Sequence, residues 1–454
     1  MEELIQKALA AAQADYIEVR IHRARTTAVA FVGQELEDVG ERSGVGGCVR
    51  ALLRGGWGFV SFNDIEHLPR YVGLACEAAR LVGGGTETIA NAPPARAEVR
   101  ATPAENPDAI CLMEKHDLCA RYNRLILGAS PKIQTSVVRY ADSRGSVIFA
   151  NSEGTFITQE VIFCGISLLA VAKDGTNVQM AHHSVGDLRG FGIVRNLEGE
   201  CETVARRAVD LLAAEPVRGG RYTVILDPKL TGVFAHEAFG HLSEADFCYE
   251  NDRLRALMTF GKRFGSELVS VIDDPTLPLL AGSYAYDDEG TAARPTVLLK
   301  EGILCGRLHS RVTAAKMDEA PTGNARALGH TYAPIVRMSN TYVAAGPHSF
   351  EAMLAETPHG IYAVGFVGGQ TNMEMFTFTA EEGYLIEGGR LGRRVRDVTL
   401  TGNLFETLTA IDRVAGDVQH VGGLGGCGKG GQGPLRVSSG GPHVRIRNVL
   451  VGGR

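Results

Sequence analysis

The stretch RYTVILDPKLTGVFAHEAFGHLSEADF, residues 221–247, places two histidines and a glutamate shortly after a predicted strand. RYTVIL has the composition of a strand, the Asp-Pro pair marks a turn, and the following residues predict a helix that continues through the histidines. His236, Glu237 and His241 have the spacing H-E-x-x-x-H, which is one residue longer than the H-E-x-x-H pattern of zinc peptidases. This strand–helix unit with a candidate metal site is the centre of the third segment of the chain.

The extra residue changes the geometry of the two histidines. On a regular α-helix, residues five apart point about 140° away from each other, so the two rings would not face one metal ion. A one-residue π-bulge would bring them to the same side, and such bulges concentrate at functional sites. Gly240 precedes His241 and is the residue type that lets the backbone deform. A surface cluster or a pair of hydrogen-bonded core histidines is the alternative interpretation.

A catalytic zinc ion usually has three protein ligands and one open position, so a third ligand is required. The candidates are Glu244, Asp246, Cys248, His330 and Cys427, and spacing does not choose among them. Cys427 lies in GGLGGCGKGGQG, where the small neighbours would let another part of the fold approach a thiolate closely. It could equally be an ordinary small residue in a flexible loop.

The same glycine-rich segment resembles a phosphate-binding loop, and we reject that interpretation. Residues 423–429 match the first seven positions of the P-loop pattern, but Gly430 stands where a Ser or Thr should hold magnesium. The following GQGPLRVSSGGP does not predict a helix, so there is no helix dipole to receive a phosphate.

Composition excludes several classes of function. The chain has 454 residues, 44% hydrophobic and 22% charged, with a formal net charge of −6, which argues against a nucleic-acid or anionic-membrane binder. No window reaches the roughly 18 uninterrupted apolar residues of a membrane helix, and the N-terminus lacks the pattern of a signal peptide. The nine cysteines are scattered without a C-x-x-C motif, which is typical of reduced thiols. We therefore expect a cytoplasmic protein.

Hydrophobic alternation and turn residues predict an α+β fold with four parts. Residues 1–82 form an N-terminal α/β module, 83–107 a Gly/Pro/Ala-rich linker, 108–215 a middle α/β module, and 216–454 a mainly antiparallel-β domain that carries the metal-site helix. In the first module, glycines at 44, 46–47 and 55–56 predict tight turns, and residues 65–82 predict a helix. In the middle module, turn signals at 142–145, 151–154 and 174–177 predict hairpins, and residues 199–215 predict a helix.

Several motifs in the same order give the chain a family resemblance. Besides HEAFGHLSEADF, they include DDEGTAARPTVLLKEGIL (287–304), TGNARALGHTYAPIVRMSNTY (322–342), EEGYLIEGGRLGRRVRDVTLTGN (381–403) and GGCGKGGQGPLRVSSGGPHVRIRNVLVGG (425–453). With these motifs the chain resembles the TldD/TldE (PmbA) family of metallopeptidases, and specifically its metal-bearing TldD branch. SGVGGCVRALLRGGWGFVSFND (43–64) matches the family's N-terminal module more loosely, so that the resemblance extends over nearly the whole length.

The resemblance implies a zinc site in which His236, His241 and Cys427 are the ligands and Glu237 is the catalytic base. Glu237 would activate a zinc-bound water for hydrolysis of a peptide bond. The resemblance further implies a cytoplasmic enzyme that acts on small or unfolded peptides. Its partner would be a TldE/PmbA-like paralogue in a heterodimer, or a second copy in a homodimer.

Four further residues are candidates for supporting roles. Glu244 and Asp246 could orient the ligand histidines, as carboxylates commonly do, or they could be solvated acids at a helix end. Arg337 and Asn340 in PIVRMSNTY could bind a peptide carboxylate or backbone, or they could fix a turn. An unfolded peptide could bind by strand addition to an exposed sheet edge, which reads backbone rather than side chains.

Two functions from different classes follow from these residues. The first is a zinc-dependent peptidase that cleaves small or unfolded peptides. The second is a non-catalytic modulator subunit that binds peptides and keeps a structural metal. The presence of Glu237 favours the peptidase, because a structural site needs no base.

Overall fold

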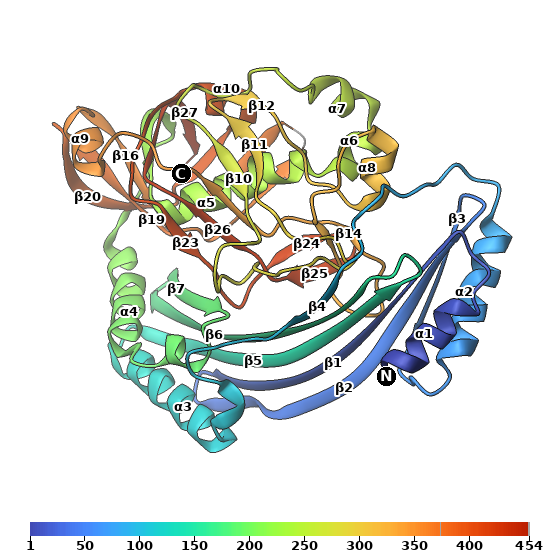
Figure 1. Cartoon of the computed structure of the whole chain (residues 1–454). Helices are drawn as coiled ribbons and strands as arrows, with labels where there is room; N and C mark the ends of the chain where they lie inside the picture. The colour runs from blue at the N-terminus through green and yellow to red at the C-terminus, as the bar shows by residue number, and fades with distance from the viewer. Residues whose placement is uncertain (373, 453–454) are drawn as a thin grey trace.

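One long, curved sheet forms the N-terminal half of the protein (Figure 1). The computed structural model describes residues 1–372 and 374–452. In order across the sheet, the strands are β3 (Gly56–Phe62), β2 (Glu35–Leu53), β1 (Tyr16–Val32), β5 (Ile133–Asn151) and β6 (Phe156–Asp174), with β4 (Arg96–Val99) and β7 (Asn177–Asp187) both paired to β6. All pairs are antiparallel except β4 with β6.

Two pairs of helices cover the two ends of one face of this sheet. The helices are α1 (Glu2–Ala10), α2 (Leu68–Val82), α3 (Leu112–Gly128) and α4 (Glu198–Ala213). Val19 of β1 is buried with α1 and α2, whereas Val29 of the same strand is buried with α3 and α4. Because alternate residues of a strand share a face, these odd-numbered positions show that both helix pairs lie on the same side. The C-terminal domain occupies the other side (Figure 1).

The C-terminal domain is built on a ten-stranded, mixed sheet. Its strands, in order, are β17 (Gly368–Asn372), β18 (Met375–Thr379), β21 (Thr399–Asn403), β27 (Val444–Gly452), β9 (Gly220–Leu226), β16 (His359–Val364), β19 (Glu382–Glu387), β20 (Arg390–Arg396) and β8 (Glu215–Pro216), with β22 (Ile411–Val414) also paired to β27. Only β16 with β9 and β20 with β8 are parallel pairs. The C-terminal strand β27 therefore lies beside β9, the strand that leads into the candidate metal site.

A second, six-stranded sheet packs beside the first. It contains β12 (Ile303–Leu304), β11 (Thr296–Lys300), β10 (Val271–Asp273), β15 (Asn340–Val343), β26 (Ser438–Gly441) and β23 (Gln419–Val421). Two small ribbons are formed by β13 (Ala325–Arg326) with β14 (Ile335–Val336), and by β24 (Cys427–Lys429) with β25 (Gln432–Leu435). The helices are short: α5 (Pro228–Ala235), α6 (Ala245–Glu250), α7 (Asp252–Leu257), α8 (Arg311–Met317), α9 (Phe350–Ala355) and α10 (Leu404–Thr409). Over the described residues, every helix is too short or too polar to span a bilayer.

The α+β class, with antiparallel sheets and a mainly β C-terminal domain, is confirmed. The predicted helices at 65–82 and 199–215 correspond to α2 and α4, and the turns at 151–154 and 174–177 join β5 to β6 and β6 to β7. The hairpin predicted at 142–145 is wrong, because these residues lie inside β5 and pair with β1 on one side and β6 on the other. Pairing on both edges keeps this turn-like sequence extended.

The tight turns predicted at 44 and 46–47 are also wrong, because β2 continues through them. A Cβ at Gly46 would lie 2.3 Å from the His330 ring, and a Cβ at Gly47 would lie 2.6 Å from the Phe62 ring. Two of these glycines therefore serve close packing within a strand rather than chain reversal.

The predicted N-terminal and middle modules contribute strands to the same sheet, through the pairing of β1 with β5. The predicted linker 83–107 supplies β4 to that sheet. The first and middle segments are thus joined by continuous backbone hydrogen bonds.

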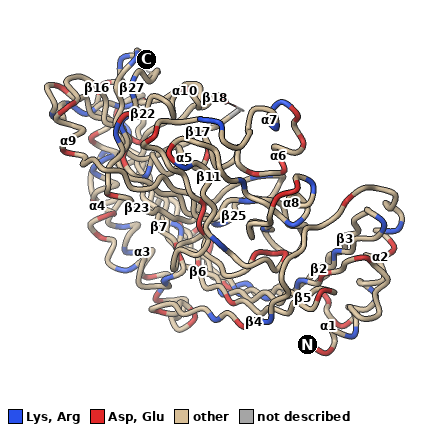
Figure 2. Tube along the Cα trace, turned by 45° about the horizontal axis from the view of Figure 1, so that its top comes forward, with Lys and Arg blue, Asp and Glu red and all other residues tan. Residues whose placement is uncertain are grey.

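Ion pairs link the sheet to the C-terminal domain. The Arg20 guanidinium lies 3.0 Å from Asp288, and Arg50 lies between Glu18 at 3.0 Å and Glu289 at 2.8 Å. Both arginines are buried. Elsewhere, acidic and basic residues are interspersed along the trace (Figure 2). These buried pairs fix the C-terminal domain against the concave side of the sheet.

A buried charge pair attaches α3 to the sheet. Lys115 Nζ donates to Asp142 Oδ2 at 2.6 Å and to the Thr27 hydroxyl at 3.3 Å, while the Tyr140 hydroxyl donates to the same carboxylate at 2.5 Å. The Lys115 and Asp142 side chains are only 1% and 2% exposed. Each charge is therefore compensated almost entirely by its partner.

We expect Lys115→Met to lower the free energy of unfolding by about 3–5 kcal/mol, because it leaves the Asp142 charge buried and unpaired. The double variant Lys115→Met/Asp142→Asn should recover much of this loss. Urea denaturation monitored by circular dichroism measures both. As a control, Lys132→Met removes an exposed pair with Asp174, of 49% and 60% side-chain exposure, and should cost less than about 1 kcal/mol. Equal losses for the two lysines would contradict this prediction.

Candidate metal centre

The strand–helix unit brings the two histidines to one side through a change of helix type. Asp227 caps α5 by accepting the Leu230 amide at 2.8 Å, and Pro228 occupies the first helical position. After α5, residues His236–Gly240 form a π-helical turn, in which the His241 amide donates to the His236 carbonyl. The two rings lie with centroids 5.3 Å apart. The predicted π-bulge is confirmed.

Gly240 has a role different from the predicted one. Its φ and ψ of −57° and −54° are ordinary helical values, so the conformational freedom of glycine is not used. A Cβ at this position would lie 2.1 Å from the Met338 sulfur, and Met338 is fully buried. The π-helical turn therefore packs directly against Met338, and a side chain at position 240 would need the buried methionine to move.

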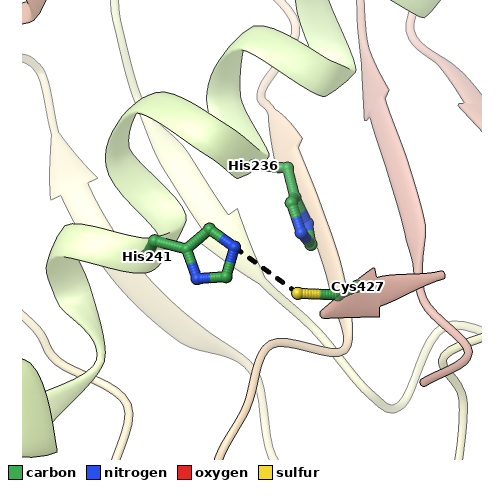
Figure 3. A group of neighbouring side chains, drawn as sticks. All are labelled: His236, His241 and Cys427. Carbon is green, nitrogen blue, oxygen red and sulfur yellow. Dashed lines mark hydrogen bonds between the residues drawn. The ribbon is translucent and has the colours of Figure 1, made fainter. Parts of the chain in front are cut away.

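A short β-ribbon brings Cys427 to the histidines. Cys427 begins β24, and the fully buried Arg337 donates to the carbonyl of Cys427 at 2.5 Å and to that of Gln432 at 3.0 Å. The Cys427 sulfur lies 3.4 Å from His241 Nε2. One ligand atom from each of His236, His241 and Cys427 lies within 4.8 Å of the others. Figure 3 shows the two rings and the sulfur converging from the helix and the ribbon.

The electrostatics of this cluster favour a thiolate. Burial raises the pKa of Cys427, but the adjacent His236 and His241 outweigh that effect and lower the pKa to about 5. Burial lowers the pKa of His241, but the Cys427 sulfur and the Glu244 carboxylate raise it to about 10. His236 Nδ1 is buried without a hydrogen-bond partner among the described residues. The cluster thus places a sulfur that favours the thiolate form beside two imidazole rings.

A series of buried charged groups connects His241 to Lys429 of the β24 ribbon. The Glu244 carboxylate, fully buried, lies 2.9 Å from His241 Nδ1, and Lys429 Nζ lies 3.1 Å from the same Glu244 oxygen. Lys429 also donates to Asp246 at 2.7 Å. Burial raises the pKa of Glu244, but Lys429 and His241 more than offset this effect, and the pKa lies below its usual value. Glu244 is therefore a buried partner of His241 rather than a solvated acid, whereas Asp246 contacts Lys429, and an orienting role for either stays a prediction.

Lys429 was not singled out from the sequence. It lies two residues after Cys427, and alternate residues of a strand share a face. The two-residue spacing from Cys427 could have indicated Lys429, since β24 carries both the sulfur and the ammonium group toward the π-helical turn. Lys429 ties the ribbon to the segment that follows His241.

Glu237 faces solvent beside the cluster. Its carboxylate lies 4.0 Å from His241 Nε2, and its side chain is 31% exposed. Glu237 and His241 line a cleft of about 710 Å³, together with Phe247, residues 369–371 of β17 and residues 428–430 after Cys427. Of the three potential ligands, His241 therefore borders a cleft large enough for a peptide segment, with Glu237 beside it.

The remaining candidates lie elsewhere. The Arg337 and Asn340 side chains are fully buried and bonded to the protein: Arg337 to the ribbon, and Asn340 to the Asp274 carbonyl at 2.8 Å. Their assignment to substrate binding stays a prediction that this burial does not favour. Cys248 is buried and donates to the Leu242 carbonyl, and His330 pairs with Asn63. Neither belongs to the His–His–Cys cluster.

Comparison with known families agrees with these features along the whole chain. Residues 17–79, 105–214 and 219–453 match the descriptions of domain 1, the central domain and the C-terminal domain of the PmbA/TldA metallopeptidases. The chain belongs to the PmbA/TldD family. The family resemblance found in the sequence is thereby confirmed.

Relatives in this family are named as metalloproteases. A protein named Metalloprotease slr0863 from Synechocystis is 44% identical, covering 97% of this chain and 95% of the relative. Metalloprotease MJ0996 from Methanocaldococcus jannaschii is 37% identical, covering 95% and 96%. A Zinc metalloprotease TldD homolog from Saccharolobus solfataricus is 31% identical, covering 74% and 75%. These names place the chain on the TldD side of the PmbA/TldD family.

Solved structures share the fold. A protein from Thermotoga maritima, described as a modulator of a DNA gyrase, superposes with a TM-score of 0.80 at 19% identity, covering 99% of this chain and 100% of that one. TldE from Thermococcus kodakarensis superposes with a TM-score of 0.77 at 20% identity, covering 100% and 99%. The PmbA/TldD architecture is thus common to TldD-like and TldE-like proteins.

We expect Gly240→Ala to reduce metal affinity at least about 10-fold, because the added methyl group collides with Met338 and displaces the π-helical turn that carries His241. Competition with a chromogenic chelator measures the affinity. The double variant Gly240→Ala/Met338→Ala should regain part of it, since it removes the collision. An unchanged affinity in Gly240→Ala would contradict the steric explanation.

Proposed function

We propose that the protein is a zinc-dependent peptidase that hydrolyses small or unfolded peptides. The observation that carries this proposal is the convergence of two imidazoles and a cysteine sulfur beside an open cleft whose wall contains His241 and Glu237. A purely structural site would need neither the glutamate nor the cleft.

The donor set of His236, His241 and Cys427 fits Zn²⁺. Two imidazoles and one thiolate are ligands that zinc prefers, and three protein ligands leave one position for a catalytic role. The lowered pKa of Cys427 fits the same requirement, because a thiolate offers the ion a lone pair and a negative charge. Bound here, zinc would supply a Lewis acid that activates water and polarises a carbonyl group.

The residues of the chain supply the proton transfers and the orientation. Glu237 follows the first histidine directly and is positioned to take a proton from the attacking water and return it to the leaving amine. Glu244 accepts a hydrogen bond from His241 Nδ1–H, so that Nε2 is directed toward the Cys427 sulfur. Lys429 keeps Glu244 charged in its buried position.

We further propose that the substrate binds as an added strand on β17. This strand ends the ten-stranded sheet and pairs only with β18 among the described strands, so its outer edge is free. Residues 369–371 line the same cleft as Glu237, and the Thr371 hydroxyl has no hydrogen-bond partner in the described part of the chain. Backbone hydrogen bonds do not depend on the side chains of the substrate, so this mode of binding suits an unfolded peptide of any sequence.

We place this activity in the cytoplasm, where a reducing environment would keep Cys427 as a thiolate. All nine cysteines are free in the structure. The second candidate function is a modulator subunit that binds peptides and keeps a structural metal, and it draws support from the shared fold of proteins described as TldE or as a gyrase modulator.

Glu237→Gln should lower kcat/KM for an unstructured peptide by about 10²–10⁴-fold while zinc remains bound, because the ligands are intact and only the base is lost. His241→Ala should lose both zinc and activity. Mass spectrometry of the released fragments and metal analysis by plasma emission measure the two quantities. Glu250→Gln is the matched control, since Glu250 lines the same cleft without contacting the cluster.

Cleavage that survives Glu237→Gln would remove this mechanism. Zinc bound in wild type and variant, with no cleavage by either, would favour the modulator.

N-methylation of single substrate amides should test strand addition. Methyl groups on the amides that donate to β17 should raise KM about fivefold each, since each removes roughly 1 kcal/mol of hydrogen bonding, whereas methyl groups on the intervening amides should have little effect. The expected result of the methylation scan is therefore a two-residue period in KM. A scan without that period would exclude this mode of binding.

A further inference from the structure

One arginine between the N-terminal sheet and the C-terminal domain has no acidic partner. Arg436 directly follows β25 and is partly buried, and its Nη2 atom donates to the Ser143 hydroxyl at 2.6 Å. Its guanidinium lies 4.2 Å from the centre of the Phe163 ring. Among the described residues, no carboxylate contacts Arg436, and the charged neighbour that acts on it is another cation, Arg326.

This environment is unfavourable for a guanidinium group. Burial and the charge of Arg326 lower the pKa of Arg436 to about 10. Arg326 stays close, because it donates to the Arg436 carbonyl at 2.9 Å. The buried Arg20 and Arg50, by contrast, have carboxylates at 2.8–3.0 Å. A charge taken out of water needs an opposite charge or several hydrogen bonds in return, and one hydroxyl and an aromatic ring supply only part of that to Arg436.

The space beside Arg436 is open. The C-terminal domain touches the concave side of the sheet at Gly46 and at Gly165, where an added Cβ would collide with side chains of that domain. Between these two contacts, Gly44 has no atom within 4 Å of its Cβ position. The nearest atoms to the Cβ position of Gly145 are two carbonyls of the sheet itself, at 3.6 and 3.9 Å. The C-terminal domain therefore leaves this part of the concave face uncovered.

Two hydroxyl groups lie on the uncovered part. Thr26 of β1 is exposed and stands directly opposite Ser143 of β5. Thr26 shares the face of Arg20, which contacts the C-terminal domain, because alternate residues of a strand point to the same side. Side chains directly opposite each other have Cβ atoms about 4.5–5.5 Å apart, so both hydroxyls can reach one small group. Arg42 is the next residue of this row, and it already pairs with Asp38 at 3.6 Å.

We propose that Arg436 and the hydroxyls of Thr26 and Ser143 bind a small oxyanion, a carboxylate or a phosphate, on the concave side of the sheet. A guanidinium offers N–H groups in a planar fork that matches the oxygens of both anions. Ser143 accepts a hydrogen bond from Arg436 and so keeps its own proton for the anion. The bound anion supplies the negative charge that the protein itself does not place beside Arg436.

The anion has two possible sources. Every peptide ends in a carboxylate, so the proposed peptidase activity would bring one to the protein, whereas inorganic phosphate is independent of that activity. The site itself rests on neither zinc nor catalysis. The alternative is that Arg436 only attaches the end of the β24–β25 ribbon to the sheet, through Ser143 and Phe163.

Isothermal titration calorimetry at constant ionic strength, in chloride buffer, tests the proposal on the wild-type protein. The titrants are inorganic phosphate, N-acetyl-alanyl-alanine and the C-terminal amide of that dipeptide. We expect phosphate or the free dipeptide to bind and the amide not to bind, because the amide lacks the charge. Binding of only one of the two anions identifies the source. Binding of neither anion, or equal binding of the dipeptide and its amide, would overturn the proposal.

Variants locate the bound anion. Arg436→Met should weaken binding at least about tenfold, because it removes the charge-assisted hydrogen bonds. Thr26→Val, an exposed change of similar shape, should weaken binding about fivefold, and it decides the matter if circular dichroism shows that Arg436→Met is unfolded. Arg25→Met, on the opposite face of β1, is the control and should bind normally. His241→Ala should also bind normally. Unchanged affinity in a folded Arg436→Met, or lost affinity in His241→Ala, would contradict this site, the latter by placing the anion at the metal centre.

Discussion

The hydrogen bond from the His241 amide to the His236 carbonyl spans five residues instead of four, and the candidate metal centre depends on it. In a regular helix the two rings would diverge, and Cys427 could reach only one of them. The π-helical turn removes this divergence at the cost of a less favourable backbone geometry, which is why such turns are rare outside functional sites. Gly240 makes the turn possible by leaving room for Met338 beneath it.

Two cationic side chains hold the β24–β25 ribbon against this turn. Arg337 donates hydrogen bonds to carbonyls of the ribbon that carries Cys427, and Lys429 of that ribbon contacts the Glu244 carboxylate, which in turn contacts His241. Both cations are buried, so the charges and carbonyls that they contact must stay in place to compensate them. The position of the sulfur is thereby coupled to the orientation of a histidine ring. Glu237 remains outside this network and faces the cleft, as a group that must exchange protons with a substrate should.

The long N-terminal sheet contributes in a different way. Its helices cover the two ends of one face, and buried arginines hold the C-terminal domain on the other face, which leaves part of β1 and β2 without a neighbour in the chain.

The sequence by itself determined the strand–helix unit at 221–247, the need for a π-bulge, the α+β class and the helices at 65–82 and 199–215, because these depend on neighbours within a few residues. It did not determine that residues 142–145 would be extended or that Gly46 and Gly47 would serve packing, since turn-forming residues take an extended shape when strands pair on both sides. Nor could spacing choose Cys427 from the possible third ligands; only the family resemblance indicated it. Only the tertiary structure brings the Cys427 sulfur to the histidines, because the sulfur and His241 are 186 residues apart. They meet through the pairing of sheets and through the hydrogen bonds of Arg337 and Lys429.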